Sequence, residues 1–246
     1  MGRRWRPAYN DPVKNPPLIE AILLRRYKRF LADVIMPDGS QQTVHVPNTG
    51  SLLGCIREGS TCYLQDHGGT ARKYRYSLFM VKPGRSLVCV DTGLPNRLVL
   101  EAARRQGIVE LAGYHEYISE VPYGTGSRID LLCRIHTRDM LERCWVEVKA
   151  TTLVEDRVAL FPDAVTARGR KHLAELEAMV GQGDRALQLF FIQRRDCDVF
   201  RPAAHIDAAY AEALHRAHAA GVEILALRGE PTKQGIRIGR PIPVEL

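Results

Sequence analysis

Turn signals punctuate the first third of the chain. Between residues 18 and 92, tetrapeptides rich in Gly, Pro and Asn separate short runs of strand-forming residues. Short strands closed by turns at this spacing predict a small barrel or sandwich, and a five-stranded OB-like barrel suits a region of about 70 residues. The run ILLRRYKRFLADVIM at 22–36 is expected to be one long extended segment. The turn signals are PDGS at 37–40, PNTG at 47–50, REGS at 57–60, HGGT at 67–70 and KPG at 82–84.

The pattern changes after Gly93. Residues 96–111 and 166–181 have helical composition, with Thr166 as a plausible N-cap of the second helix and Gly181 as its stop. Residues 186–193 form a continuous apolar strand, and a further helix ends at Gly221. Helices alternating with strands predict an α/β domain with a mixed central sheet. The fold class is therefore α+β in two domains, with an extension at 1–17, an OB-like barrel at 18–92 and an α/β domain at 93–246.

The excess positive charge lies at one end of the chain. Residues 1–85 hold 14 Lys and Arg against 6 Asp and Glu, whereas residues 86–246 hold 21 against 22. A basic solvated surface explains this distribution, and so does a docking surface for a polyanion, most commonly nucleic acid. DNA is the expected partner, with RNA as an alternative.

Two segments of this basic region interleave cations with aromatic residues. Cations neutralise phosphates and aromatic faces stack on bases, although aromatic residues of a small barrel also serve as core. Because side chains alternate along a strand, only some of each set can face a ligand. The candidate nucleic-acid-binding residues here are Arg25, Arg26, Tyr27, Lys28 and Arg29 in the first segment and Arg72, Lys73 and Tyr74 in the second.

The run CWVEVKATT at 144–152 places two charges within a predicted buried strand. Glu147 and Lys149 project to one face, while Val146 and Val148 pack on the other. If SRIDLLCRI at 127–135 pairs with this strand as a hairpin centred between residues 138 and 139, Asp130 lies across from Glu147. Two facing carboxylates repel unless Lys149 or a divalent cation lies between them.

Two interpretations fit these charges. Asp130 and Glu147 can hold Mg²⁺ or Mn²⁺, with Lys149 stabilising charge on a phosphate, which is the chemistry of metal-assisted phosphodiester hydrolysis. A structural ion pair of Lys149 with either acid explains the same residues.

Composition also bears on location. The six cysteines show no zinc-knuckle spacing, and we expect reduced thiols in a cytoplasmic protein. No apolar run approaches the roughly 18 residues of a membrane span, so no membrane association is expected.

Five segments resemble the sugar fermentation stimulation protein (SfsA) family, in the same order along nearly the whole chain from about residue 18. The resemblance implies an N-terminal OB-like domain, a C-terminal domain similar to the PD-(D/E)xK nucleases, and DNA binding with little sequence preference. The segments are YKRFLADV at 27–34, PNTGSLLGC at 47–55, SRID at 127–130, EVKATTL at 147–153 and FPDAVTARGRKHL at 161–173.

The resemblance also implies roles for individual residues. In the nuclease superfamily the metal carboxylates fall at Asp130 and Glu147 and the lysine at Lys149. A helical glutamate upstream falls at Glu101, with Glu120 as a weaker alternative. Ile129 stands where that superfamily has proline. Near the start of the helix after Asp163, the basic residues Arg168, Lys171 and His172 suit phosphate contact, with Arg168 and Lys171 facing one groove.

Three functions follow from these observations. The first is a metal-dependent nuclease, the second is a DNA-binding regulator of sugar metabolism that retains the nuclease fold without its activity, and the third is an adaptor for an acidic partner protein. The pair of carboxylates with a lysine on two apolar strands favours the first. Oligomeric state is left open.

Overall fold

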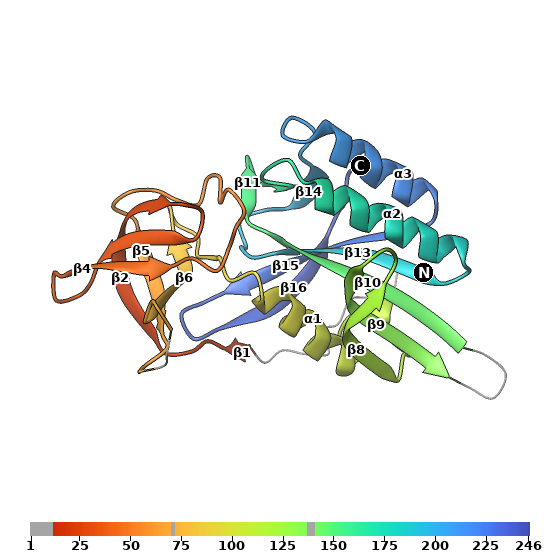
Figure 1. Ribbon diagram of the computed structural model, residues 1–246, viewed down its shortest axis with the longest axis horizontal. Helices are drawn as coiled ribbons and strands as arrows, with labels where there is room; N and C mark the ends of the chain where they lie inside the picture. Colours follow the sequence, from red (N-terminus) through yellow and green to blue (C-terminus); the bar gives the residue numbers. More distant parts are fainter. Residues whose placement is uncertain (1–11, 70–71, 137–140) are drawn as a thin grey trace.

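The computed structural model describes residues 12–69, 72–136 and 141–246. Two domains lie side by side along the long axis (Figure 1). The first is a barrel in which strands follow the order β4-β3-β2-β5-β6-β7, and a further β4–β6 pairing through His45 and Ser77 closes it. The turn spacing therefore predicted a barrel correctly. Its strands are β2 (Leu18–Tyr27), β3 (Leu31–Ile35), β4 (Gln41–His45), β5 (Thr61–Asp66), β6 (Tyr76–Lys82) and β7 (Val88–Cys89).

The first predicted strand is instead a hairpin. β2 ends at Tyr27, and β3 begins at Leu31 and pairs back along it. Lys28 and Arg29 both adopt the left-handed conformation, with φ of 49° and 64°, so they form a turn without a glycine. The expectation of one extended segment at 22–36 is wrong because no Gly or Pro marks this reversal.

The second domain is built on a seven-stranded mixed sheet in the order β1-β16-β15-β13-β10-β9-β8. β10, β13 and β15 run parallel, and β8, β9 and β16 are antiparallel to their neighbours. These strands are β1 (Val13–Lys14), β8 (Glu116–Tyr123), β9 (Ser127–His136), β10 (Leu141–Thr151), β13 (Arg185–Ile192), β15 (Glu223–Pro231) and β16 (Gly235–Ile242). A small sheet beside them holds β11 (Leu153–Glu155), β12 (Val158–Phe161) and β14 (Val199–Pro202).

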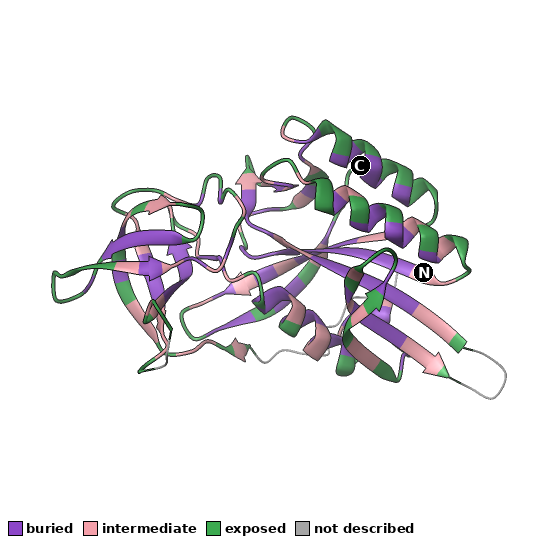
Figure 2. Ribbon diagram, in the orientation of Figure 1, coloured by how far each residue is buried: buried purple, intermediate pink, exposed green. Residues whose placement is uncertain are grey.

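Helices cover both faces of the large sheet. α1 (Leu94–Arg104) lies on one face, followed by the short 3₁₀ helix η1 (Val109–Leu111), and α2 (Ala167–Gly181) and α3 (Ala208–Ala219) lie on the other (Figure 1). The strands between them are buried along their middle sections (Figure 2). Val146 and Val148 pack toward α1, while Trp145 and Phe190 pack toward α2 and α3. Glu147 and Lys149 therefore point toward α2.

Side-chain caps start α2 and α3. Thr166 accepts a hydrogen bond from Gly169 N at 3.0 Å, as its sequence position predicted, and Asp207 accepts one from Tyr210 N at 3.0 Å. Asp207 also accepts one from Thr166 N at 2.8 Å, so a single carboxylate joins the beginnings of both helices. The first helix begins at Leu94 and ends at Arg104, which is shorter than the predicted 96–111.

The two domains share contacts. Tyr63 and Phe79 of the barrel belong to the apolar core beneath α1. Asp163, before α2, accepts a hydrogen bond from Leu52 N at 2.9 Å, and Ser51 Oγ donates to its carbonyl at 2.6 Å. Residues 13–14 form β1 on the edge of the large sheet, so this part of the predicted N-terminal extension belongs to the second domain.

All six cysteines are free and buried. The hairpin places Cys133 opposite Cys144, as the predicted register required. None of the helices in the described ranges has the length and hydropathy of a membrane span.

Candidate functional site

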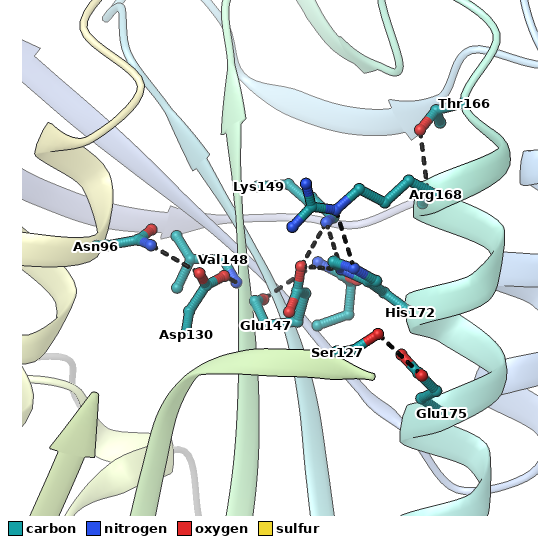
Figure 3. Close-up of polar contacts among 12 residues, drawn as sticks. Asn96, Ser127, Asp130, Glu147, Val148, Lys149, Thr166, Arg168, His172 and Glu175 are labelled. Atoms are coloured by element: carbon teal, nitrogen blue, oxygen red, sulfur yellow. Dashed lines mark hydrogen bonds and ion pairs between the residues drawn. The ribbon is translucent and has the colours of Figure 1, made fainter. Parts of the chain in front are cut away.

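The candidate site lies where β9 and β10 separate. Their pairing follows the predicted register from Leu141 and His136 to Val146 and Leu131, and it stops there. Beyond this point the Asp130 carboxylate replaces the missing backbone partner and accepts a hydrogen bond from Val148 N at 2.7 Å. Its other oxygen accepts one from Asn96 Nδ2 of α1, also at 2.7 Å (Figure 3). The fork in the sheet thus holds the first carboxylate in place.

Glu147 is the most buried member of the site, with 2% of its surface exposed. One carboxylate oxygen, Oε1, contacts Lys149 Nζ at 2.5 Å and His172 Nδ1 of α2. The other oxygen, Oε2, is buried and has no hydrogen-bond partner. Such a buried acceptor in a native protein calls for an unseen water or ion.

The two acids differ in their electrostatic surroundings. Burial and the nearby Glu147 carboxylate raise the pKa of Asp130 to about 6, against the smaller opposing effects of Val148 N–H, Lys149 and Asn96. Burial also acts to raise the pKa of Glu147, but the hydrogen bond from His172 and the charge of Lys149 outweigh it and lower that pKa. Neighbouring acids with pKa values pushed apart are typical of functional sites.

α2 brings two basic residues to the acids. Arg168 Nε lies 3.3 Å from His172 Nε2, and His172 Nδ1 lies 3.2 Å from Lys149 Nζ. Figure 3 shows Arg168 reaching over Glu147 from the first turn of the helix. Because the helix places residues four apart on one face, Arg168 and His172 converge on one point.

The other residues of that predicted basic turn lie differently. Lys171 points away and donates to Thr125 O at 2.7 Å. Contrary to the prediction, it therefore does not share a face with Arg168. His172 is only 4% exposed, which does not match a surface contact to phosphate. Its position beside Glu147 could have been suspected from the buried Leu173 and Leu176 that share its side of the helix.

Glu101 does not join the carboxylates. It pairs with Arg105 one turn on, at 2.8 Å, and Asn96 of the same helix contacts Asp130 instead. Asn96 was not predicted, because a single polar residue in a helical first turn carries no pattern. Gln188 was not predicted either; it is fully buried beside Glu147 on β13 and donates to Glu147 O at 3.2 Å.

The cations of the first barrel segment have separate roles. Arg25 pairs with Asp33 at 2.8 Å, and Tyr27 donates to the same carboxylate at 3.1 Å. Arg26 donates to the carbonyls of residues 48, 50 and 51 and holds that loop. Lys28 and Arg29 stand in the exposed turn between β2 and β3. The segment therefore does not present one alternating face.

The second barrel segment precedes a strand. β6 begins only at Tyr76, so Arg72, Lys73 and Tyr74 belong to the connecting loop. Arg72 NH1 lies 3.2 Å from His67 Nε2, and Lys73 Nζ lies over the Tyr74 ring, 5.5 Å from its centroid. Arg72 and Lys73 are exposed and remain accessible to a ligand.

The site has a donor set that suits a hard divalent cation. Asp130 and Glu147 supply carboxylate oxygens, and the orphaned Glu147 Oε2 has capacity for a further partner. Across the parts of the chain that the structure describes, no cluster of three or more His, Cys, Asp or Glu has metal-binding geometry. A cation held here would therefore need water or phosphate oxygens to complete its shell, as Mg²⁺ commonly does.

Comparisons with known proteins cover nearly the whole chain. Residues 24–90 match the family model described as the SfsA N-terminal OB domain, and residues 93–235 match the one described as the sugar fermentation stimulation protein RE domain. The sugar fermentation stimulation protein homolog of Citrifermentans bemidjiense is 49% identical over 230 residues, 94% of this chain and 98% of its own length. The homolog of Pelobacter propionicus is 47% identical over 234 residues, 95% and 100% of the two chains.

A solved structure is also similar. It is that of Pyrococcus furiosus SfsA in complex with Ca²⁺, with a TM-score of 0.83 and 28% sequence identity. The match covers 95% of this chain and 98% of that one.

Proposed function

Because the chain belongs to the sugar fermentation stimulation protein (SfsA) family, we propose that it binds DNA with little sequence preference and cleaves phosphodiester bonds in a metal-dependent reaction. The single observation that carries this proposal is the hydrogen bond from Val148 N to Asp130, which places this carboxylate at the fork between β9 and β10 beside the paired Glu147 and Lys149. We assign Asp130 and Glu147 to binding Mg²⁺ or Mn²⁺. The Ca²⁺ complex of the Pyrococcus furiosus protein supports the binding of a hard divalent cation by this chain.

The residues of the site divide the work of hydrolysis. Asp130 and Glu147 would hold the metal, which would supply the activation of a water and the neutralisation of a phosphate oxygen. Hydrogen bonds from Asn96 Nδ2 and Val148 N hold the Asp130 carboxylate in one orientation, so the lone pairs that they leave free have a fixed direction. Lys149 and Arg168 supply positive charge, which stabilises the negative charge that develops on the phosphate in the pentacoordinate transition state. His172, on α2, orients Glu147 and Lys149 through its contacts with both side chains.

Cleavage of labelled DNA tests the proposal. Purified protein is incubated with single- and double-stranded substrates, with Mg²⁺, with Mn²⁺ and with EDTA. Glu147→Ala and Lys149→Ala should each lower the rate by at least about 100-fold, the size typical of losing a charge-stabilising group. Glu116→Ala, which removes an exposed carboxylate on the neighbouring β8, is the matched control and should leave the rate unchanged. Cleavage that survives both site variants would refute the assignment.

A non-enzymatic DNA-binding regulator is the second candidate. It is favoured by the lack of a three-residue metal cluster in the described ranges and by the ion pair that Lys149 already makes with Glu147. This candidate predicts no cleavage with either metal, together with binding that falls steeply between low and moderate salt. RNA as a competitor in the binding assay distinguishes the two nucleic acids. An adaptor for an acidic protein would show neither DNA cleavage nor DNA binding.

A further inference from the structure

A cleft lies at the junction of the two domains, next to the candidate site. It has a volume of about 340 Å³ and is lined by Arg26, Arg29, the barrel loop 49–51 and the segment 161–166 that leads into α2. Arg168 follows two residues after the last of these, and it points toward Lys149 (Figure 3). Along a helix that rises about 1.5 Å per residue, Thr166 and His172 are roughly 9 Å apart. The cleft and the paired acids are therefore close enough to be reached by adjoining parts of one ligand.

The walls of the cleft are basic and partly apolar. Arg29 is exposed and makes no hydrogen bond or ion pair with any described residue, so its charge is available. Arg26 donates to the loop carbonyls through its two terminal nitrogens, its Nε is buried without a hydrogen-bond partner, and its charge lies at the same wall. Asp163 is the acid of this wall, and it is committed to Leu52 N. Val165 presents an aliphatic side chain at 71% exposure, which is unusual for valine and suits contact with a base or sugar.

Size restricts what can enter. A volume of about 340 Å³ falls at the lower end of the roughly 300–1,000 Å³ of small-molecule sites, so one nucleotide unit fits. A B-form duplex, whose major groove alone is about 12 Å wide, does not. Phosphate is attracted by the exposed Arg29 at the wall of this cleft.

We propose that this cleft holds one unpaired nucleotide of a single-stranded nucleic acid, whose neighbouring phosphate lies at Arg168 and Lys149. The inference rests on the proposed function and narrows it, because it names the single strand as the substrate class. The barrel turn at Arg29 then directs the single-stranded nucleic acid, and the domain junction forms the entry to Asp130 and Glu147.

Binding without metal tests this inference separately from catalysis. Fluorescence anisotropy in EDTA compares a short labelled single strand with its duplex, using the wild-type chain, Arg29→Glu and Arg57→Glu. Arg57 is an exposed arginine of the same barrel outside the cleft, so it is the matched control. Arg29→Glu should weaken single-strand binding by about tenfold and lower the salt slope by about one, while Arg57→Glu changes affinity less than about twofold.

Crosslinking gives a second readout. A single strand carrying 4-thiothymidine should form adducts within 49–51 or 161–166, and Arg29→Glu should reduce their yield. Arg29→Gln serves in place of the charge reversal if that variant does not fold. Equal effects of Arg29→Glu and Arg57→Glu, equal affinity for duplex and single strand, or adducts only elsewhere would overturn the inference. Wild-type protein that binds through the cleft but never cuts refutes the proposed nuclease instead, whereas cutting without dependence on Arg29 refutes the cleft.

Discussion

Asp130 and Glu147 are two carboxylates of one site in different states. Hydrogen bonding to His172 and the charge of Lys149 lower the pKa of Glu147, whereas burial and the nearby Glu147 raise the pKa of Asp130 to about 6. The hairpin register predicted that the two lie opposite each other, and the observed pairing follows that register up to Val146 and Leu131, one residue before them. Their difference follows from the helices that pack behind each strand, α2 behind Glu147 and α1 behind Asp130, and no sequence pattern contains that information.

The raised pKa of Asp130 predicts a pH-dependent stability. Its folded pKa of about 6 lies above the unfolded value of 3.8, so its ionisation destabilises the folded state, with a penalty that begins above pH 3.8 and is complete above about pH 6. In the metal-free protein this group should therefore contribute a gain in stability of up to about 3 kcal/mol as pH falls from above 6 to below 4. Asp130→Asn should be more stable than wild type at pH 7.5 and lose this gain, as measured by urea unfolding in EDTA. A variant less stable than wild type at pH 7.5 would contradict this assignment.

His172 allows a second test at the same scale. Its removal leaves the buried Glu147 with fewer partners, so His172→Ala should lower the free energy of unfolding by about 2 kcal/mol. His215→Ala, on the exposed face of α3, is the control and should change it by less than about 0.5 kcal/mol. Chemical denaturation with circular dichroism measures both. Equal effects would show that His172 does not support Glu147.

The sequence predicted the positions of helices and strands more accurately than the side chains that each of them directs toward the site. Turn tetrapeptides marked the barrel strands, and the capping residue Thr166 marked the start of α2, because local chemistry decides both. The β2–β3 reversal was missed since Lys28 and Arg29 take a left-handed conformation that their residue types rarely adopt. Glu101 was misplaced because the packing of α1 against the sheet, not its periodicity, decides which residue meets Asp130.

The shared cap at Asp207 leads to a prediction about two helices. Thr166→Ala removes one N-cap bond and should cost about 1 kcal/mol. Asp207→Ala removes bonds to Tyr210 N and Thr166 N and the ion pair with Arg170, so it should cost about 2–4 kcal/mol. Thermal unfolding of both variants measures the difference. Equal losses would mean that the two helices start independently.

At the scale of the whole molecule, family matches over both regions confirm the resemblance and the two-domain fold class. What composition and turn spacing could not predict is how the domains meet. Tyr63 and Phe79 of the barrel enter the core beneath α1, and the loop at 48–52 closes on Asp163. Contacts between residues more than 100 positions apart leave no local signal.

The contact at Asp163 can be tested by proteolysis. Asp163→Ala removes the acceptor for Leu52 N and leaves a backbone N–H unpaired at the domain junction. We expect faster cleavage within 49–54 by a nonspecific protease, and a loss of about 1–2 kcal/mol of stability. Glu58→Ala, an exposed acid of the same barrel, should behave as wild type. An unchanged cleavage pattern would show that Arg26 and the bond from Ser51 Oγ to the carbonyl of residue 163 hold the loop without the Asp163 carboxylate.

The path of the chain through the two domains has a consequence for how they vary. The chain leaves β1, on the edge of the large sheet, enters the barrel at Leu18 and returns to the sheet domain at α1. The barrel is therefore an insertion fastened at both ends, and a rigid rotation about one connection would be resisted by the other. The outer loops of the barrel can therefore change in length and sequence without moving the Asp130 and Glu147 carboxylates, which lie on β9 and β10 of the sheet domain.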